Sequence, residues 1–442
     1  MSAPVRIQFL NHASVKFITD TVKLVSDPWY AGSIFNHGWS LIWTAEQLAD
    51  MAADSDFIWV SHEHPDHFSP AFFNQLRGPR PKVLFQATRD RRVARYLSGR
   101  GFAVREIKNH ERVQLSPVEY LTIGKNALYD SWNLFESGET RILNLNDCII
   151  KTAGDLRAVK KRVGHIDVLL TQFSYAGWAG DRSNKGLRED AARRRLGVMR
   201  AQIQHLEPSF VIPFASFAWF SHEENTYLND SVNHVADFLD MCADLNSVPI
   251  VMQPLETWRV GEPHDNAPAI RFWDRAYDAI PSFPRRPPGP SIEVADLRAA
   301  CAAYQRRVFT KNSKLWMQLL AAVPFVGMFG PVRIRLTDID RTVRFSFFDE
   351  LREVENGGQV DVEMASDSLA FIFAHEFGYD TLMVNARCSG TKAGLDVVMR
   401  NFGIGNLNTM GWSIGPRMLW MVVRDFKLVW LVLRELKNVN PE

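Results

Sequence analysis

The strongest chemical signal in the sequence is the segment SHEHPDH, residues 61–67, which directly follows the apolar run FIWV. Neutral imidazoles and carboxylates are common ligands of transition-metal ions, and burying three imidazoles and a carboxylate without a partner is costly. His62 and His64 are two residues apart, so in an extended segment their side chains point to the same side. The turn at the intervening proline would bring Asp66 and His67 to a second position nearby. We therefore predict a metal centre, with a solvated histidine loop as the alternative.

The motif and several segments outside it resemble the metallo-β-lactamase fold superfamily, whose signature HxHxDH is matched by His62, His64, Asp66 and His67. Within that superfamily, the pattern is most similar to the catalytic region of the CMP-N-acetylneuraminate hydroxylases and to the L-ascorbate-6-phosphate lactonase group. The segments that carry this similarity are NHAS at 11–14, SDPW at 26–29, GW at 38–39, NLNDC at 144–148 and PFA at 213–215. They fall within residues 1–260.

This resemblance implies two metal ions that share ligands. His62 and His64 would serve one ion, and Asp66 and His67 would serve the other. Asp147, at the end of the apolar run RILNLN, takes the place of the aspartate that bridges both ions in the superfamily. A turn residue or helix cap is the alternative role for Asp147.

Two histidines of the superfamily pattern are missing from their usual places. Where the third histidine of the first site is expected, the chain has Asp130, which either coordinates or orients a histidine from a turn. His110 is the alternative ligand there, although a strand is expected between it and the site. His222, which follows the PFA segment, is the expected last ligand of the second site.

A carboxylate in place of an imidazole favours iron or manganese over zinc. Together with the hydroxylase resemblance, it implies a diiron oxygenase that acts on a small molecule with dioxygen. The Rieske iron–sulfur domain of those hydroxylases needs Cys-x-His and Cys-x-x-His pairs, which this sequence lacks, so an external electron donor is expected. The alternatives are a hydrolase of a lactone, amide or phosphodiester, in which a metal-bound hydroxide attacks, and a metal-free binding module.

Further candidate residues lie on loops near the expected strand ends. His12 is expected beside the metal centre, where it joins Asp66 as a catalytic candidate or serves a structural role. Tyr175, Trp178 and Trp219 are candidate substrate-binding residues, with core packing as the alternative. Asp27 is expected to orient a metal ligand through a hydrogen bond. The basic run 193–195 is expected on the exposed side of its helix.

The elements that must position these residues form an α/β pattern. Strands are expected at 5–10, 15–19, 23–26, 57–60, 83–86, 141–145, 168–171, 210–213 and 250–253, and helices at 45–53, 90–100, 188–206 and 230–245. With the resemblance, this pattern predicts an αββα sandwich of the metallo-β-lactamase type followed by a smaller α+β domain. Five prolines in residues 281–290 mark a linker, so we expect domains at 1–285 and 286–442.

The second domain weakly resembles the sterol-carrier-like domains that are appended to some enzymes of the superfamily. We expect a helix at 292–320, strands at 332–336, 344–348, 359–363 and 381–388, and a helix at 366–375. A last helix at 417–437 has apolar faces that would dock on its own domain, contact a second copy in a homodimer, or lie on a membrane surface.

Composition excludes several classes of function. The chain has 442 residues and balances 51 Lys+Arg against 50 Asp+Glu, which gives no field to attract nucleic acid. The four cysteines are far apart and form no CxxC pair, as in proteins of reducing compartments. The sequence shows no signal-type start and no transmembrane segment, because its longest apolar stretch is interrupted by proline and glycine. A cytoplasmic location is therefore expected.

Overall fold

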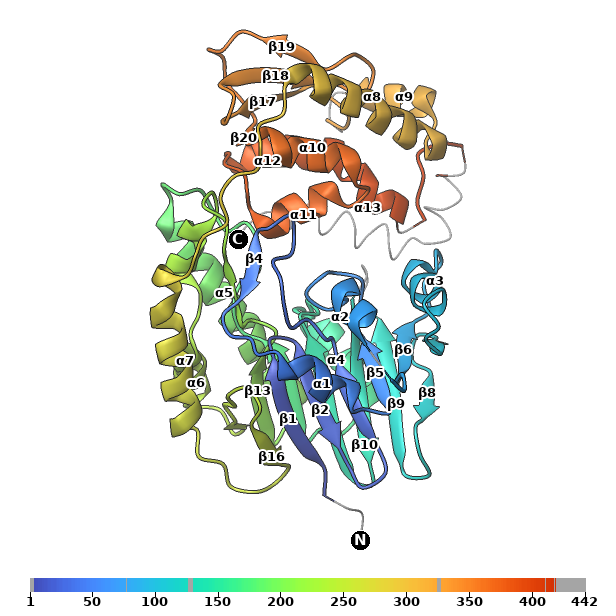
Figure 1. The fold of residues 1–442 in the computed structure, drawn as a ribbon, viewed down its shortest axis with the longest axis vertical. Helices are drawn as coiled ribbons and strands as arrows, with labels where there is room; N and C mark the ends of the chain where they lie inside the picture. Colours follow the sequence, from blue (N-terminus) through green and yellow to red (C-terminus); the bar gives the residue numbers. More distant parts are fainter. Residues whose placement is uncertain are drawn as a thin grey trace.

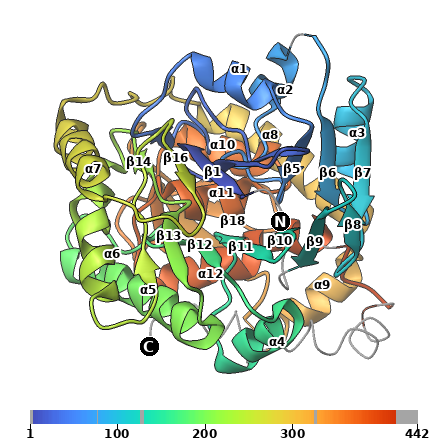
Figure 2. The ribbon, with the colours of Figure 1, turned by 90° about the horizontal axis from the view of Figure 1, so that it is seen from below.

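The computed structural model describes residues 4–76, 78–125, 130–323, 327–409, 411–416 and 418. Its larger part contains two seven-stranded β-sheets that face each other between outer layers of helices (Figures 1 and 2). The predicted αββα sandwich is therefore confirmed. Many strands are buried on both faces, as expected for sheets covered on both sides.

The first sheet combines an antiparallel half with a parallel half. Strands β16, β1, β2 and β3 pair antiparallel, whereas β3, β5, β6 and β7 pair parallel. In sheet order the strands are β16 (Thr257–Arg259), β1 (Arg6–Asn11), β2 (Ser14–Ile18), β3 (Lys23–Ser26), β5 (Phe57–Val60), β6 (Lys82–Gln86) and β7 (Val104–Ile107).

The second sheet has the same mixed character. Strands β8 to β11 pair antiparallel, and β11, β12, β13 and β15 pair parallel. In sheet order the strands are β15 (Val248–Pro249), β13 (Phe210–Phe214), β12 (Val168–Gln172), β11 (Thr140–Asn146), β10 (Ser131–Ser137), β9 (Glu119–Lys125) and β8 (Arg112–Gln114). A separate pair joins β4 (Trp39–Leu41) and β14 (Ala218–Phe220).

The outer helices bury apolar stripes against the sheets. One layer packs Leu48, Phe72 and Val93 on the first sheet, and the other packs Leu156 and Met199 on the second. The helices of this part are α1 (Gln47–Ala53), α2 (Pro70–Gln75), α3 (Arg92–Ser98), α4 (Ala153–Val163), α5 (Lys185–Leu206), α6 (Val235–Cys242) and α7 (Ala267–Ala279), with the 3₁₀ helices η1 (Thr226–Ser231) and η2 (Ile280–Ser282).

The smaller part is an α+β domain with its own hydrophobic core, in which Tyr304, Phe345 and Phe402 pack together. Its four-stranded sheet has the order β19 (Arg352–Val354), β18 (Arg341–Phe345), β17 (Val332–Leu336), β20 (Val362–Met364). Its helices are α8 (Val294–Lys311), α9 (Lys314–Ala321), α10 (Ser366–Ala374), α11 (Gly378–Asn385), α12 (Lys392–Phe402) and α13 (Ile404–Thr409). We keep a boundary after residue 285 as a proposal, because the two parts have separate cores.

Three expected elements differ in the structure. The helix expected at 292–320 is two helices, because Asn312 leaves helical geometry and hydrogen-bonds to Asn408 and to the backbone of Ile414. The strand expected at 381–388 is the helix α11, since a short apolar run does not distinguish the two. Residues 250–253 continue from β15 as a loop. The helix expected at 417–437 lies outside the described residues, apart from Met418.

The C-terminal part sits on the loops of the sandwich, with α11 beside β4 (Figure 1). Asn385 at the end of α11 donates to the Phe35 carbonyl at 3.0 Å, and Asn225 donates to the Asn385 carbonyl at 2.7 Å. Among the described helices, none has the length and apolar character that a bilayer crossing needs.

Candidate metal centre

The candidate site lies where several strands of both sheets end. At four of these ends a non-glycine residue has a left-handed backbone, with φ of 36° at His12, 39° at Asp27, 58° at Asn146 and 48° at Ala215. Such residues are uncommon, and they persist only where the surrounding structure holds them. Here hydrogen bonds hold them, because Asn146 donates to Asp27 and the Ala215 N–H donates to the His12 carbonyl.

The histidine motif forms a tight loop between β5 and α2. The His64 carbonyl accepts hydrogen bonds from the backbone N–H groups of His67 at 3.0 Å and Phe68 at 2.7 Å. The entry to the loop is held by the Ser61 N–H, which donates to Asp27 at 2.7 Å. At its exit, Ser69 caps α2. The loop therefore turns back on itself, as the proline in the motif indicates.

One group of possible ligands consists of His62, His64 and Asp130. His62 Nε2 lies 2.8 Å from His64 Nδ1 and 3.8 Å from Asp130 Oδ1. Ligands about 2 Å from one ion lie about 3 Å apart, so these spacings fit a shared cation. The structure thus places Asp130 with the two histidines, where the sequence pattern has no third histidine.

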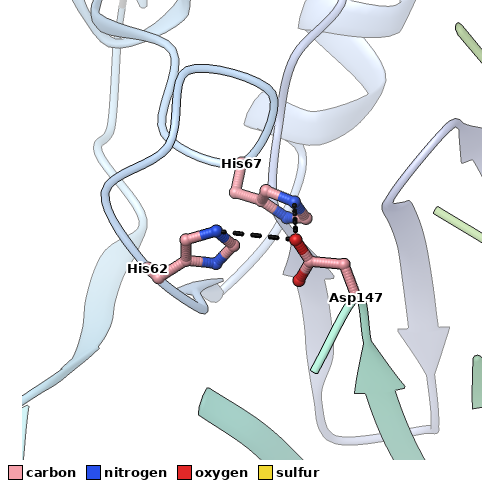
Figure 3. Close-up of side chains that lie close together, drawn as sticks. All are labelled: His62, His67 and Asp147. Atoms are coloured by element: carbon pink, nitrogen blue, oxygen red, sulfur yellow. Dashed lines mark ion pairs between the residues drawn. The ribbon is translucent and has the colours of Figure 1, made fainter. Parts of the chain in front are cut away.

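A second group consists of His62, His67 and Asp147 (Figure 3). Asp147 Oδ2 lies 3.7 Å from His62 Nε2 and 3.4 Å from His67 Nε2. Asp66 Oδ2 lies 3.1 Å from His67 Nε2 on the other side. Because His62 belongs to both groups, the two groups adjoin, and Asp147 Oδ2 faces both His62 and His67.

Several buried polar atoms in this cluster have no hydrogen-bond partner in the described part of the chain. They are Asp66 Oδ1, Asp147 Oδ1, His67 Nε2 and both ring nitrogens of His12. His12 Nε2 lies 3.6 Å from Asp66 Oδ2. Unpaired buried polar atoms are costly, and metal ligation is the chemistry that this donor set would satisfy. The residues therefore fit a pair of metal ions.

The charged groups of the cluster shift one another's pKa values. Burial raises the pKa of Asp130 to about 7, and the neighbouring Asp147 carboxylate acts in the same direction. Burial also acts against ionisation of Asp147, but His67 and His62 outweigh it and lower the pKa of this carboxyl. Burial opposes protonation of His64, yet Asp380 reverses the balance and raises its pKa to about 10. Cations would offset the repulsion among these carboxylates.

Two carboxylates orient histidines of the cluster from outside. Asp27 Oδ2 accepts from His67 Nδ1 at 3.1 Å, the role expected for it. Asp380 on α11 accepts from His64 Nε2 at 3.0 Å. Sequence reasoning missed Asp380, which is 316 positions from His64 and has no motif around it.

His222 and His110 lie apart from both groups. His222 Nδ1 is 3.3 Å from Glu224 Oε2 and accepts a hydrogen bond from the Glu224 N–H at 3.2 Å. His110 packs near the Trp132 ring, 6.0 Å between centroids. The structure therefore does not bring the expected last ligand, His222, to the second group, and the histidines that lie near Asp66 are His67 and His12.

The three candidate substrate-binding residues do not lie at one place in the structure. Tyr175 and Trp219 line a cavity of about 20 Å³ together with His12, which has room for about one water molecule. Trp178 lies outside this cavity, and its backbone N–H donates to the Met383 carbonyl at 2.7 Å. The more open side of the cluster is elsewhere: the side chains of Asp147 and His64 are 21% and 29% exposed, against 1% for His62.

The expectation that the whole basic run 193–195 lies on the exposed side of its helix is wrong for Arg195. Arg193 and Arg194 are exposed, but Arg195 lies on the inward stripe of α5 between Ala192 and Met199. Burial lowers the pKa of Arg195 to about 10, against the attraction of Asp147 and Asp130. Its Nε has no hydrogen-bond partner among the described residues. The spacing of the buried positions on this helix could have identified it.

Comparison with known proteins agrees with the fold. Residues 6–215 match the family model described as the beta-lactamase superfamily domain. The cytidine monophosphate-N-acetylneuraminic acid hydroxylase of Danio rerio is 24% identical over 251 residues, which cover 51% of this chain and 40% of the relative. That of Pongo pygmaeus is 26% identical over 258 residues, covering 51% and 41%. The chain thus spans about two fifths of the length of these curated relatives.

Among solved structures, CmlA, a diiron beta-hydroxylase from Streptomyces venezuelae, has a TM-score of 0.40 and 16% identity and covers 59% of this chain and 55% of its own. Igni18, a metallo hydrolase from Ignicoccus hospitalis, has a TM-score of 0.40 and 12% identity and covers 59% and 99%. The family match and the two facing sheets agree with the HxHxDH signature. Residues 6–215, slightly under half of the chain, match the beta-lactamase superfamily domain, and the two facing sheets have the metallo-β-lactamase fold, followed by a C-terminal α+β part.

Proposed function

We propose that this protein is a binuclear metal-dependent enzyme, namely a non-haem diiron oxygenase that acts on a small molecule. The observation that carries the proposal is the position of Asp130. Its carboxylate, rather than an imidazole, completes the group with His62 and His64, while His110 lies apart. Carboxylate ligands favour iron or manganese over zinc, and bound iron would supply the reduction of dioxygen. The similarity to hydroxylases supports the same reaction class.

In this proposal the residues divide between holding the ions and admitting the substrate. His62, His64 and Asp130 hold one ion, and Asp66 and His67 hold the other. Asp147 lies between them. The buried side of the cluster, where His62 and His67 are 1% exposed or less, excludes water. The substrate approaches the partly exposed side of His64 and Asp147.

Tyr175 and Trp219 line the cavity beside His12, and in this proposal they remain the candidate residues for binding part of the substrate. His12 Nε2 is 3.6 Å from Asp66 and could hold a proton at that atom during turnover. Electrons come from an external donor. All four cysteines are buried and unpaired, which supports a reducing, cytoplasmic compartment.

The experiment is anaerobic reconstitution with ferrous iron followed by exposure to oxygen. We expect about two iron ions per chain, a charge-transfer absorption band and oxygen consumption. His64→Ala should abolish the band and the oxygen consumption. Two zinc ions in the protein as purified, with lactonase, amidase or phosphodiesterase activity and no oxygen uptake, would instead identify a metal-dependent hydrolase.

A further inference from the structure

We propose that the C-terminal domain contributes a residue to the metal centre. This residue, Asp380, positions His64 for metal binding. The inference rests on the proposed metal centre but not on the choice between oxygenation and hydrolysis. Asp380 is a positioning residue, because it contacts a ligand rather than the ion. If Asp380 has this role, tight metal binding depends on the docking of a domain that lies outside the family match of residues 6–215.

The geometry at His64 assigns opposite roles to its two ring nitrogens. Nε2 lies 3.0 Å from Asp380 Oδ2, and Nδ1 lies 2.8 Å from His62 Nε2, inside the ligand group. A neutral imidazole has one N–H donor and one acceptor nitrogen. Because a carboxylate accepts from Nε2–H, the ring gives up the proton on Nδ1 when an ion binds, and the lone pair on Nδ1 faces the position of the ion. Asp27, which belongs to the sandwich, orients His67 in the same way. There Nδ1 faces the carboxylate and Nε2 faces the ligand group.

Asp380 is held in place by close contacts between α11 and the sandwich. A Cβ at Gly38 would lie 2.3 Å from Asn385 Cβ, and one at Gly177 would lie 3.0 Å from the Met383 carbonyl oxygen. These glycines allow a backbone approach that other residues would prevent. The Phe35 ring also packs edge-on against His64, 5.9 Å between centroids, and its carbonyl accepts from Asn385. The contacts that dock α11 therefore also surround His64.

The test compares Asp380→Asn with Glu376→Gln as a matched control. Glu376 lies just before α11, and Glu376→Gln removes one negative charge, as Asp380→Asn does. Glu376 pairs with Lys311 and not with His64. Metal affinity is measured for the full chain by competition of a chelator for Co²⁺ or Zn²⁺, together with the visible spectrum of the Co²⁺ form. Loss of such an orienting partner weakens metal binding by about 10–100-fold. We expect this loss and an altered spectrum for Asp380→Asn, partial recovery for Asp380→Glu, and wild-type binding for Glu376→Gln.

A second readout is the tautomer of His64, measured by ¹⁵N NMR in the metal-loaded protein. We expect the Nε2–H form in the wild type and a mixture in Asp380→Asn. Circular dichroism checks that the metal-free variants are folded. Wild-type affinity and an unchanged tautomer in Asp380→Asn overturn the inference, as does an equal loss in Glu376→Gln. A wild-type protein that binds two ions but hydrolyses its substrate would overturn the oxygenase proposal and leave the role of Asp380 supported.

Discussion

At the scale of single residues, the proposed preference for iron rests on Asp130. It shares its ligand group with His62 and His64, and burial together with Asp147 raises its pKa to about 7. A carboxyl with such a pKa is only partly ionised near neutral pH, and a bound cation would stabilise its charged form. Binding at this group is therefore coupled to the release of a proton from Asp130.

Replacing Asp130 by histidine tests the metal preference. We expect Asp130→His to shift the metal content of the purified protein from iron toward zinc, because three imidazoles favour zinc. Asp130→Glu keeps a carboxylate and should keep iron. The measurement is elemental analysis of protein purified without chelators. Iron retained by Asp130→His at the wild-type level would show that Asp130 does not select the metal.

His222 allows a prediction about acid stability. Burial lowers its pKa from the usual 6.5 to about 4, and the Arg387 charge acts in the same direction. Between pH 6.5 and about 4 the unfolded chain binds a proton that the folded protein does not bind. This residue therefore costs stability as the pH falls through that range. His222→Gln should flatten this part of the profile in urea unfolding. Identical profiles for wild type and His222→Gln would refute the prediction.

At the scale of elements, the pairing of β9 with β10 positions Asp130, which directly precedes β10. Trp132 on β10 lies opposite Gly124 on β9, and a Cβ at Gly124 would meet the Trp132 ring at 1.9 Å. The glycine therefore makes room for the tryptophan, and the tryptophan anchors the start of the strand beside the site.

We expect Gly124→Ala to destabilise the protein by about 1–3 kcal/mol, because the buried Trp132 ring must move. The same change at Gly197, in α5, meets no atom within 4 Å. Gly197→Ala should instead stabilise by about 0.5–1 kcal/mol through helix propensity. Chemical denaturation measures both values, and equal values for the two variants would contradict the packing argument. Displacement of Trp132 should also weaken metal binding at Asp130.

The elements also show how far the sequence predicts the fold. The sandwich could be predicted because the histidine motif and its accompanying segments resemble the metallo-β-lactamase superfamily, while the short apolar runs indicated only some of its strands. The helix α11 could not, because TLMV is compatible with a helix or a strand and only packing decides. Likewise His62, His64, Asp66 and His67 form one contiguous motif, whereas Asp380 reaches the site only through domain docking.

At the scale of the whole molecule, a buried arginine joins the two parts. The Arg387 side chain is fully buried, with Nε 2.7 Å from Glu224 and Nη2 2.8 Å from Asp367. Its Nη1 donates to the Asn36 carbonyl at 3.1 Å. Asn36 and Glu224 belong to the sandwich, and Asp367 and Arg387 belong to the C-terminal part.

Breaking this network should destabilise the docked arrangement. We expect Arg387→Met to cost about 3–5 kcal/mol, because Glu224 and Asp367 lose their buried partner. Arg341→Met removes a surface pair with Glu353 and should cost less than about 1 kcal/mol. Denaturation followed by circular dichroism measures both, and proteolysis in the segment 281–290 reports undocking. Similar costs for the two variants would exclude a special role for Arg387.

The contact between His64 and Asp380 has a consequence for biosynthesis. The two residues are 316 positions apart, so the ribosome makes the histidine motif long before its partner. At roughly 5–20 residues per second, the interval is on the order of 15–60 s. During that time the sandwich is able to fold and the motif is present, but His64 lacks the carboxylate that orients it. A nascent chain would therefore hold metal weakly, and tight loading would follow synthesis of α11 and its docking on the sandwich.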